Sequence, residues 1–287
     1  MKSVFAGICG AILALLLVDC GQLPKKPLIG NNNSPYKEQS THSSAQKAAD
    51  SQQLPSTATA YELPAIAQGE MIVRHTGYTL SYNKEHNTPN WSAWCLTAEH
   101  TDGPVPRGKK FWDDPAIPTP YRVTYYDYKE SGYDRGHMCP AGDMKWSEEA
   151  MHDCFYMSNM CPQMGTLNSG AWNRLEAKCR EWAIREGALY IVCGPVYDNK
   201  RHERIGIEHA IDVPEGFFKA ILSLKKGEEK AIAFYVYNDE SRQSYKTATL
   251  SVDEAEELTG LDLFCALDDS LEQRLEKTNN LRDFDKR

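Results

Sequence analysis

The sequence lacks the short motifs that mark several common enzyme and metal-binding classes. It contains no CxxC pair, which is the usual spacing of zinc ligands, and no GxSxG motif around a nucleophilic serine. A glycine-rich phosphate-binding loop is missing as well. These absences exclude the enzyme classes that depend on such motifs and leave zinc as a minor alternative.

The chain also lacks an excess of positive charge, with 32 Lys and Arg against 40 Asp and Glu and a net charge of −8. The acidic residues are unevenly placed, because residues 253–287 hold 11 Asp and Glu against 5 Lys and Arg. The remainder is close to neutral, and the local field matters more to a ligand than the total charge. The overall charge therefore does not exclude a nucleic-acid partner.

Long apolar runs are confined to the N-terminus. Lys2 precedes an apolar stretch over residues 4–18 that is too short to span a membrane comfortably, and this pattern predicts a signal peptide over residues 1–20. The stretch LLLVDC resembles the lipobox of bacterial lipoproteins, which implies a lipid anchor at Cys20. Asp19 departs from that box, and ordinary secretion is the alternative. We expect an exported protein, either an outer-membrane lipoprotein or a periplasmic or extracellular one.

Two regions follow the signal. Residues 21–68 are rich in Ser, Asn, Gln, Lys and Pro and cannot bury enough apolar surface to offset the entropy of ordering, so they predict a flexible tether. Residues 69–287 are long enough to enclose a sizeable core, and we expect them to form one folded domain.

Strand and helix patterns are interspersed along this domain. Strand patterns cover residues 70–83 in two parts, 91–99, 188–197, 217–224 and 230–238, and helical patterns cover 147–158, 171–187 and 251–260. Ser147 is the predicted N-cap of the first helix, Gly187 ends the second, and Ser251 with Glu254 opens the third. The order predicts an α+β fold with a mixed, antiparallel-rich sheet and flanking helices.

The segment DRGH, residues 134–137, gathers an acid, a cation and a histidine. On an extended strand Arg135 and His137 project to one face. An arginine fork fits phosphate oxygens, and a neutral imidazole takes a proton from water. Asp134 orients the imidazole or organises water. These groups suit phosphodiester hydrolysis, and we interpret Gly136 as space for a passing substrate phosphate.

A second segment is dense in side-chain amides. Asn168 and Glu176 stand eight residues apart across a predicted helix start, about two turns, and so project to broadly the same side. Oxygen ligands of this kind suit magnesium, a hard ion that keeps several waters.

Three motifs in order, DRGH at 134–137, SNMCPQ at 158–163 and LNSGAWNRLE at 167–176, resemble those of the DNA/RNA non-specific endonucleases, the ββα-metal nucleases. The similarity runs from about Glu70 to Leu267. It implies a ββα-metal nuclease core on the predicted sheet and a sugar-non-specific endonuclease that hydrolyses DNA and RNA. Because the implied contacts go to phosphate, metal and water, little sequence specificity follows.

The resemblance also implies a role for each residue that matches a family motif. His137 matches the general base, Arg135 the arginine that contacts phosphate, and Asn159 a supporting asparagine near the active centre. Asn168 matches the direct protein ligand of Mg²⁺, and Glu176 matches the glutamate that holds a metal-bound water.

The family also has an upstream arginine that stabilises charge at the phosphate. Arg107 is the candidate here, with Lys109 and Lys110 as rivals. The implied cofactor is Mg²⁺, with Mn²⁺ as a substitute, and the implied partners are DNA and RNA bound through their phosphate backbone.

Two other classes stay open beside the nuclease. One is an inactive nucleic-acid-binding protein on a nuclease scaffold. The other is a zinc-binding protein organised by His137, Cys139, Cys154 and Cys161. The sequence does not predict the disulfide pairing or the oligomeric state.

Overall fold

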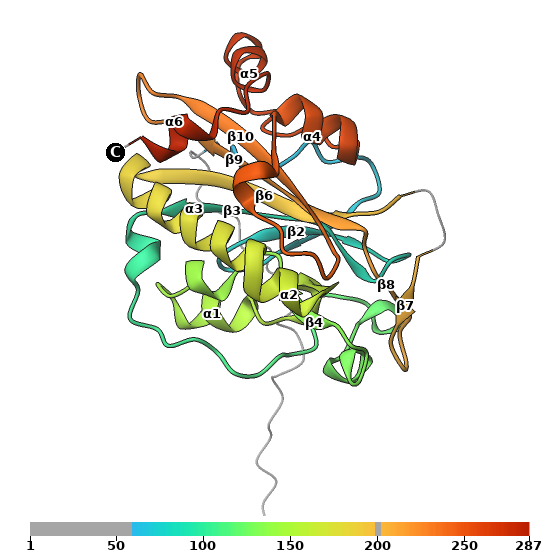
Figure 1. The fold of residues 1–287 in the computed structure, drawn as a ribbon. Helices are drawn as coiled ribbons and strands as arrows, with labels where there is room; N and C mark the ends of the chain where they lie inside the picture. Colours follow the sequence, from blue (N-terminus) through green and yellow to red (C-terminus); the bar gives the residue numbers. More distant parts are fainter. Residues whose placement is uncertain (1–58, 199–201, 287) are drawn as a thin grey trace, which may run out of the picture. The chain divides into compact units, whose positions relative to one another are not determined.

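The computed structural model describes residues 59–198 and 202–286. These residues form an α+β domain in which helices flank a large antiparallel sheet, as Figure 1 shows, and the predicted fold class is confirmed. The predicted signal peptide at 1–20, its Cys20 anchor and most of the predicted tether at 21–68 lie outside the described residues.

A seven-stranded sheet in the order β1-β2-β3-β6-β9-β10-β11 forms the centre, and every neighbouring pair is antiparallel. Its strands are β1 (Met71–Arg74), β2 (Thr79–Asn83), β3 (Thr88–Thr97), β6 (Ala188–Val196), β9 (Gly216–Ser223), β10 (Lys230–Tyr237) and β11 (Thr249–Leu250). The central strands read as near-continuous apolar runs because both of their faces are covered.

Two short ladders stand apart from this sheet. The pair β4 (Asp134–His137) and β5 (Met160–Gln163) carries the DRGH segment, and the pair β7 (Arg204–Ile205) and β8 (Ile211–Asp212) forms a small hairpin.

The α-helices are α1 (Glu148–Asp153), α2 (Gly165–Leu167), α3 (Asn173–Glu186), α4 (Val252–Thr259), α5 (Asp269–Leu275) and α6 (Leu281–Asp285), and a π-helical turn η6 (Asn168–Trp172) links α2 to α3. Single 3₁₀ turns are η1 (Glu99–Asp102), η2 (Thr119–Tyr121), η3 (Tyr125–Tyr128), η4 (Ala141–Asp143), η5 (Met157–Asn159) and η7 (Tyr245–Thr247).

The predicted helix ends are confirmed by their hydrogen bonds. The Ser147 side chain accepts from the backbone N–H of Ala150, and Ser251 and Glu254 form a reciprocal capping box. Gly187 ends α3 with φ of +87°, a conformation that favours glycine. The first helix is shorter than its pattern, because it stops at Asp153 and the chain turns towards β5.

Alternation along the strands divides the core between the two faces of the sheet. One face packs Trp94, Leu96 and Ile221 against α1 and α3, and the other packs Trp91 and Phe218 against α4 and α5. We call these the α3 face and the α4 face. Figure 1 shows the corresponding helices on opposite sides of the sheet.

The folded domain begins before the predicted boundary at residue 69. Tyr61 and Leu63 pack against the α4 face, so ordered packing starts ahead of Gly69.

The seven cysteines among the described residues are free thiols, and five of them are buried. Within 59–198 and 202–286, no helix combines the length and the apolar character that crossing a membrane requires.

Candidate active site

The ladder of β4 and β5 positions the DRGH segment. Arg135 pairs with Pro162 and His137 with Met160, so the segment is extended, which is the condition for both side chains to project to one face. Gly136 faces Gln163, and a Cβ at Gly136 would lie 2.4 Å from the amide oxygen of Gln163. Our interpretation of this glycine needs correction, because the space is filled by a buried side chain of the neighbouring strand.

The imidazole of His137 is buried, with 7% of its surface exposed, and its Nε2 has no hydrogen-bond partner among the described residues. The ring packs edge-on against Phe155, with centroids 4.8 Å apart, and 5.7 Å from Phe111. Desolvation, followed by the positive charges of Arg107 and Arg135, lowers the pKa of His137 to about 3. The ring is therefore neutral at pH 7.

Two arginines supply those charges. The Arg135 guanidinium lies 4.5 Å from the ring centroid of Tyr125 and 4.7 Å from that of Phe111, and its Nε is buried without a partner. The exposed Arg107 lies 5.3 Å from the ring of Phe155, the same ring that packs on His137.

The choice among the upstream cations follows from their neighbours. Arg107 acts electrostatically on both His137 and Glu176, whereas Lys110 lies over the ring of Trp112, at 5.8 Å. This arrangement favours Arg107 over Lys110.

The turn η6 is hydrogen-bonded to β4 at both ends. The Asn168 Nδ2 donates to the Asp134 carboxylate at 3.0 Å, and the Trp172 Nε1 donates to the backbone carbonyl of His137 at 3.2 Å. The strand that carries the imidazole thus also holds the asparagine in place.

The local path from Asn168 to Glu176 differs from our expectation. Asn168 lies in a π-helical turn, and the backbone at Gly170 leaves helical values (φ −99°, ψ −111°) before α3 begins. Spacing in a regular α-helix therefore does not describe the pair, and no hydrogen bond joins the two side chains in the described part of the chain. Irregular turns of this type are frequent at functional sites.

Glu176 stands on the first turn of α3 and is partly exposed. Desolvation raises its pKa to about 7, while the nearby positive charge of Lys219 acts in the opposite direction. That lysine is fully buried on β9, with its Nζ 4.4 Å from the ring of Trp172 and 4.8 Å from that of Trp94. Lys219 was not predicted as a site residue, because a lysine within a strand pattern normally points to solvent.

Asn159 is fully buried, and its side-chain amide makes four hydrogen bonds to protein. Its Oδ1 accepts from the Ser92 hydroxyl and the Cys139 N–H, and its Nδ2 donates to the carbonyls of Cys139 and Cys154. The amide joins β3, the segment after β4 and the end of α1. Asn159 thus fixes the position of the segment that follows His137.

The donor set fits a hard divalent cation. The Asn168 amide nitrogen is engaged by Asp134, which leaves its oxygen as the atom available to a ligand. Among the described residues, no hydrogen bond holds the Glu176 carboxylate. Oxygen donors of this kind suit a small, hydrated cation.

The zinc alternative gains no support. Within the described ranges, two groups bring metal-ligand atoms within 4.8 Å of one another, and neither contains His137 or a cysteine. Burial raises the pKa of the Cys154 thiol to about 12 and that of Cys139 well above its usual range. Both thiols are thus held protonated, whereas zinc binds the thiolate.

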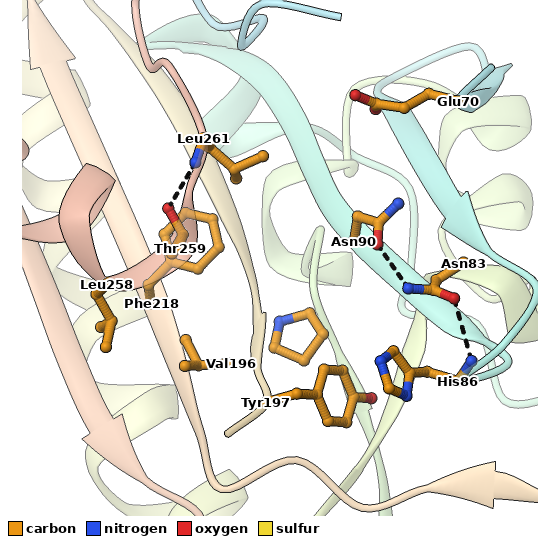
Figure 2. A pocket seen from close by; sticks show the side chains of 11 residues that line it. Glu70, Asn83, His86, Asn90, Val196, Tyr197, Phe218, Leu258, Thr259 and Leu261 are labelled. Carbon is orange, nitrogen blue, oxygen red and sulfur yellow. Dashed lines mark hydrogen bonds between the residues drawn. The ribbon is translucent and has the colours of Figure 1, made fainter. Parts of the chain in front are cut away.

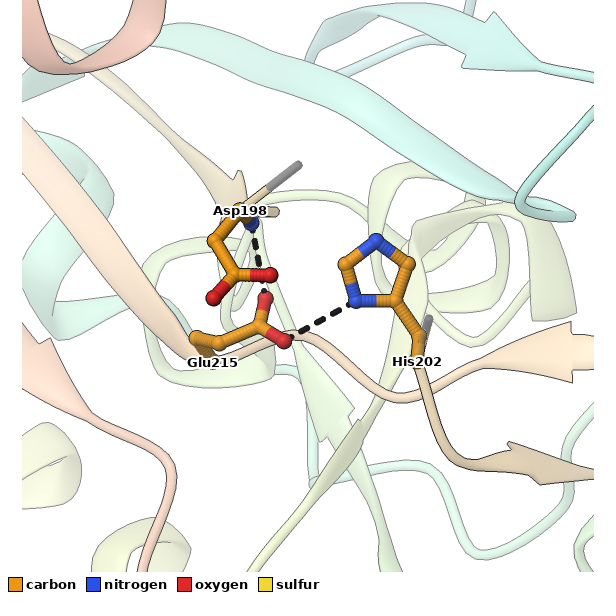
Figure 3. Close-up of side chains that lie close together, drawn as sticks. All are labelled: Asp198, His202 and Glu215. Atoms are coloured by element: carbon orange, nitrogen blue, oxygen red, sulfur yellow. Dashed lines mark hydrogen bonds and ion pairs between the residues drawn. The ribbon is translucent and has the colours of Figure 1, made fainter. Parts of the chain in front are cut away.

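One of those groups joins Asp198, His202 and Glu215, as Figure 3 shows. The Glu215 carboxylate accepts from the Asp198 N–H at 3.0 Å and from the His202 Nδ1 at 2.9 Å. Through these two bonds, Glu215 connects the segment that precedes β9 with the residues that follow β6 and precede β7. The second group, Asp253, Glu256 and Glu276, lies on the α4 face.

A cavity of about 340 Å³ lies away from the predicted site residues, none of which lines it. Figure 2 shows His86, Tyr197 and Phe218 among its walls. The rings of His86 and Tyr197 stack 4.0 Å apart, and His86 also binds Asp212 at 2.7 Å. These contacts hold the cavity wall together.

The α+β fold, the β4 strand with its histidine and the π turn beside it define a nuclease core of the ββα-metal type. The chain belongs to the DNA/RNA non-specific endonuclease family, whose family model matches residues 55–270. The predicted family and the predicted class, a nuclease hydrolase, are confirmed at this level, and the family is metal-dependent.

Individual relatives agree with this assignment. The chain is 38% identical to "Nuclease EXOG, mitochondrial" of Danio rerio, over 55% of this chain and 49% of that protein, and 36% identical to the Xenopus laevis protein of the same name, over 68% and 58%. It is 36% identical to the "Mitochondrial nuclease" of Saccharomyces cerevisiae, over 71% and 69%. The match thus spans about half the length of the first two relatives.

A solved structure shows the same fold. The EndoG/EndoGI complex, which concerns the inhibition of EndoG, superposes with a TM-score of 0.67 at 29% identity, over 75% of this chain and 91% of that one.

The predicted location is wrong. We expected an exported protein, whether an outer-membrane lipoprotein, periplasmic or extracellular, from the apolar N-terminus and the lipobox-like stretch. The curated relatives are named as mitochondrial nucleases, which contradicts that location. A short apolar run is an ambiguous signal, and the resemblance at Cys20 rested on six residues with one departure.

Proposed function

We propose that this chain is a metal-dependent endonuclease that hydrolyses phosphodiester bonds in DNA and RNA with little sequence specificity. Family membership supports the reaction class. The observation that carries the proposal is the neutral imidazole of His137, which has 7% of its surface exposed and is acted on by the charges of Arg107 and Arg135. The relatives' names also favour a mitochondrial location.

The His137 imidazole acts as the general base in this proposal. Its Nδ1 takes a proton from the water that attacks phosphorus, because Nε2 is buried away from solvent and keeps the ring proton. A pKa of about 3 makes a weak base in the resting protein. A phosphate that binds beside Arg107 and Arg135 offsets their charges, which raises the pKa of the imidazole, while desolvation, the largest cause of the low pKa, remains.

Arg135 and Arg107 bind the non-bridging oxygens and stabilise the charge that grows there. The contacts of Arg135 with the rings of Phe111 and Tyr125 fix the guanidinium before substrate arrives. Asn159 keeps the segment after His137 in position.

Asn168 would hold Mg²⁺ through its amide oxygen, and Glu176 would hold it through a bound water. When bound, such a cation supplies positive charge for the leaving 3′ oxygen. Asp134 keeps the amide of Asn168 turned so that its oxygen remains available.

The test uses the purified full chain with supercoiled plasmid and with ribosomal RNA, in Mg²⁺, in Mn²⁺ and in EDTA. We expect loss of closed circles and RNA fragmentation in either metal and neither in EDTA. The Asn168→Ala protein should need more Mg²⁺ for half-maximal cleavage. Unchanged cleavage in EDTA would refute the metal requirement, and an unchanged Mg²⁺ titration would remove Asn168 from the proposal.

A further inference from the structure

A second cavity adjoins the candidate site. It has a volume of about 290 Å³, close to the smallest ligand pockets of proteins. Lys109, Lys110, Trp112, His152 and Phe155 contribute to its lining, and none of these residues has a role in the mechanism proposed above.

Trp112 is the unusual member of this lining, because 42% of its surface is exposed. The main chain that carries the indole is nevertheless held in place. The backbone N–H of Trp112 donates to the Phe155 carbonyl at 3.1 Å, and the Trp112 carbonyl accepts from the backbone N–H of Met157 at 2.9 Å. Its ring lies 5.2 Å from that of His152. An exposed aromatic ring on a fixed backbone is a ready stacking surface.

Phe155 links this cavity to the catalytic imidazole. The ring of Phe155 lines the cavity and packs 4.8 Å from the ring of His137, and Arg107 lies over the same phenyl ring. A ligand in the cavity is thus separated from the base by one side chain. A neighbouring nucleotide of a strand whose phosphate faces His137 would reach it.

The charges around the cavity favour an anionic, flat ligand. Arg107, Lys109 and Lys110 lie within four residues and are all exposed, and the Lys110 Nζ is 5.8 Å from the Trp112 ring centroid. Glu148 is an acidic group on the wall and offers acceptors to a base amino group. A nucleotide combines the phosphate charge and the aromatic face that these groups suit.

We propose that this cavity is a nucleotide subsite in which a base next to the scissile phosphate stacks on Trp112 while Lys109 and Lys110 bind flanking phosphates. This inference rests on the proposed nuclease function. Because a paired base cannot leave the duplex without the cost of unstacking, the subsite favours single-stranded substrate. Stacking reads no hydrogen-bond pattern, so the sequence tolerance is kept.

The experiment uses an end-labelled, single-stranded thymidine 20-mer with one abasic tetrahydrofuran nucleotide at its centre. We expect the wild-type protein to cut the linkage beside the abasic nucleotide about tenfold less than the other linkages. Trp112→Ala should cut every linkage about tenfold less and show no local minimum, and Trp112→Phe should restore the minimum. A flat wild-type pattern, or a minimum that survives in Trp112→Ala, would overturn the subsite.

Matched controls separate stacking from general damage. Ile184→Ala removes an exposed apolar side chain of α3 outside the cavity and should keep the wild-type pattern. In EDTA, Lys110→Met should lower the salt dependence of oligonucleotide binding by about 0.7 in log–log slope, and Lys226→Met on the β9–β10 turn should leave it unchanged. Equal slopes for the two lysine variants would remove Lys110 from the subsite.

The same oligonucleotides distinguish the two proposals. If the wild-type protein cuts no linkage at all, the proposed function fails. Binding in EDTA then still tests the subsite, since the intact strand should bind about tenfold tighter than the abasic one through Trp112. If the protein cuts but Trp112→Ala behaves as the wild type in cutting and binding, the subsite alone fails.

Discussion

The two faces of the central sheet each bury an ionisable group with an unpartnered atom, in opposite electrostatic settings. On the α3 face His137 lies among arginines, and its pKa falls to about 3. On the α4 face Glu276 is 7% exposed, its Oε1 has no partner, and desolvation with the charges of Glu256 and Glu272 raises its pKa to about 8. Burial drives each group towards its neutral form, and the neighbouring charges act in the same direction.

The two groups differ in what would offset the charges around them. The arginines near His137 attract an anion, so a bound phosphate would offset their positive charge on the α3 face. The carboxylates near Glu276 favour its protonated form, so a rise in pH that removes the proton destabilises the α4 face. The buried His137 can thus gain favourable charge interactions when an anion binds. The buried Glu276 only lowers the stability of the fold when it loses its proton.

The largest expected effect comes from His137→Ala. Loss of the general base should slow cleavage by about 10²–10⁴-fold, while binding of an oligonucleotide in EDTA stays near that of the wild type, because phosphate contacts remain. Steady-state cleavage rates and fluorescence anisotropy measure the two. Turnover near that of the wild type would show that His137 is not the general base.

Arg135→Ala should have the next largest effect, a loss of about 10²-fold in kcat, because its charge acts mainly on the transition state. Arg135→Lys is the sharper variant. It keeps the charge but loses the planar group that contacts the rings of Phe111 and Tyr125, so it should recover only part of the rate. Full recovery in the lysine variant would show that charge alone matters there.

Gly136→Ala tests the packing of the two strands. The added methyl group would press on the buried Gln163, which should lower the free energy of unfolding by about 1–3 kcal/mol and reduce kcat by displacing the DRGH segment. Thermal unfolding and cleavage rates measure both effects. Ala accepted at no cost in stability would restore our first interpretation, a glycine needed for the substrate.

Glu276→Gln should give the smallest effect, confined to stability. The unfolded carboxyl titrates near ~4.3 and the folded one near about 8, so the stability that this group contributes is complete below the unfolded pKa and is lost as pH rises through the folded value. Gln removes that loss, and we expect its melting temperature at pH 9 to exceed that of the wild type by about 2–4 °C for each kcal/mol of stability that the wild type has lost. At pH 4 the two proteins should melt together, and a constant difference at both pH values would contradict the assignment.

Much of the fold was predictable from local pattern. The strands β1, β2, β6, β9 and β10 and the caps at Ser147, Ser251 and Gly187 follow from alternation and capping residues, which act within a few positions of the chain. The boundary of α1 was not predictable, because its end is decided by the turn towards β5.

The site was predictable only in part. The common face of Arg135 and His137 follows from their spacing once the segment is extended, but the turn at Asn168 does not follow from the sequence, since a helical count assumes an unbroken helix. The aromatic frame of Phe111, Tyr125 and Phe155 comes from three separate segments. Such tertiary contacts leave no periodic signal in the sequence.

The two hydrogen bonds that attach η6 to β4 have a further consequence. They join one end of the turn to Asp134 and the other to the carbonyl of His137, so the positions of the imidazole and of the Asn168 amide depend on each other. In the proposed nuclease, a substitution that shifts one of these two groups should therefore also displace the other.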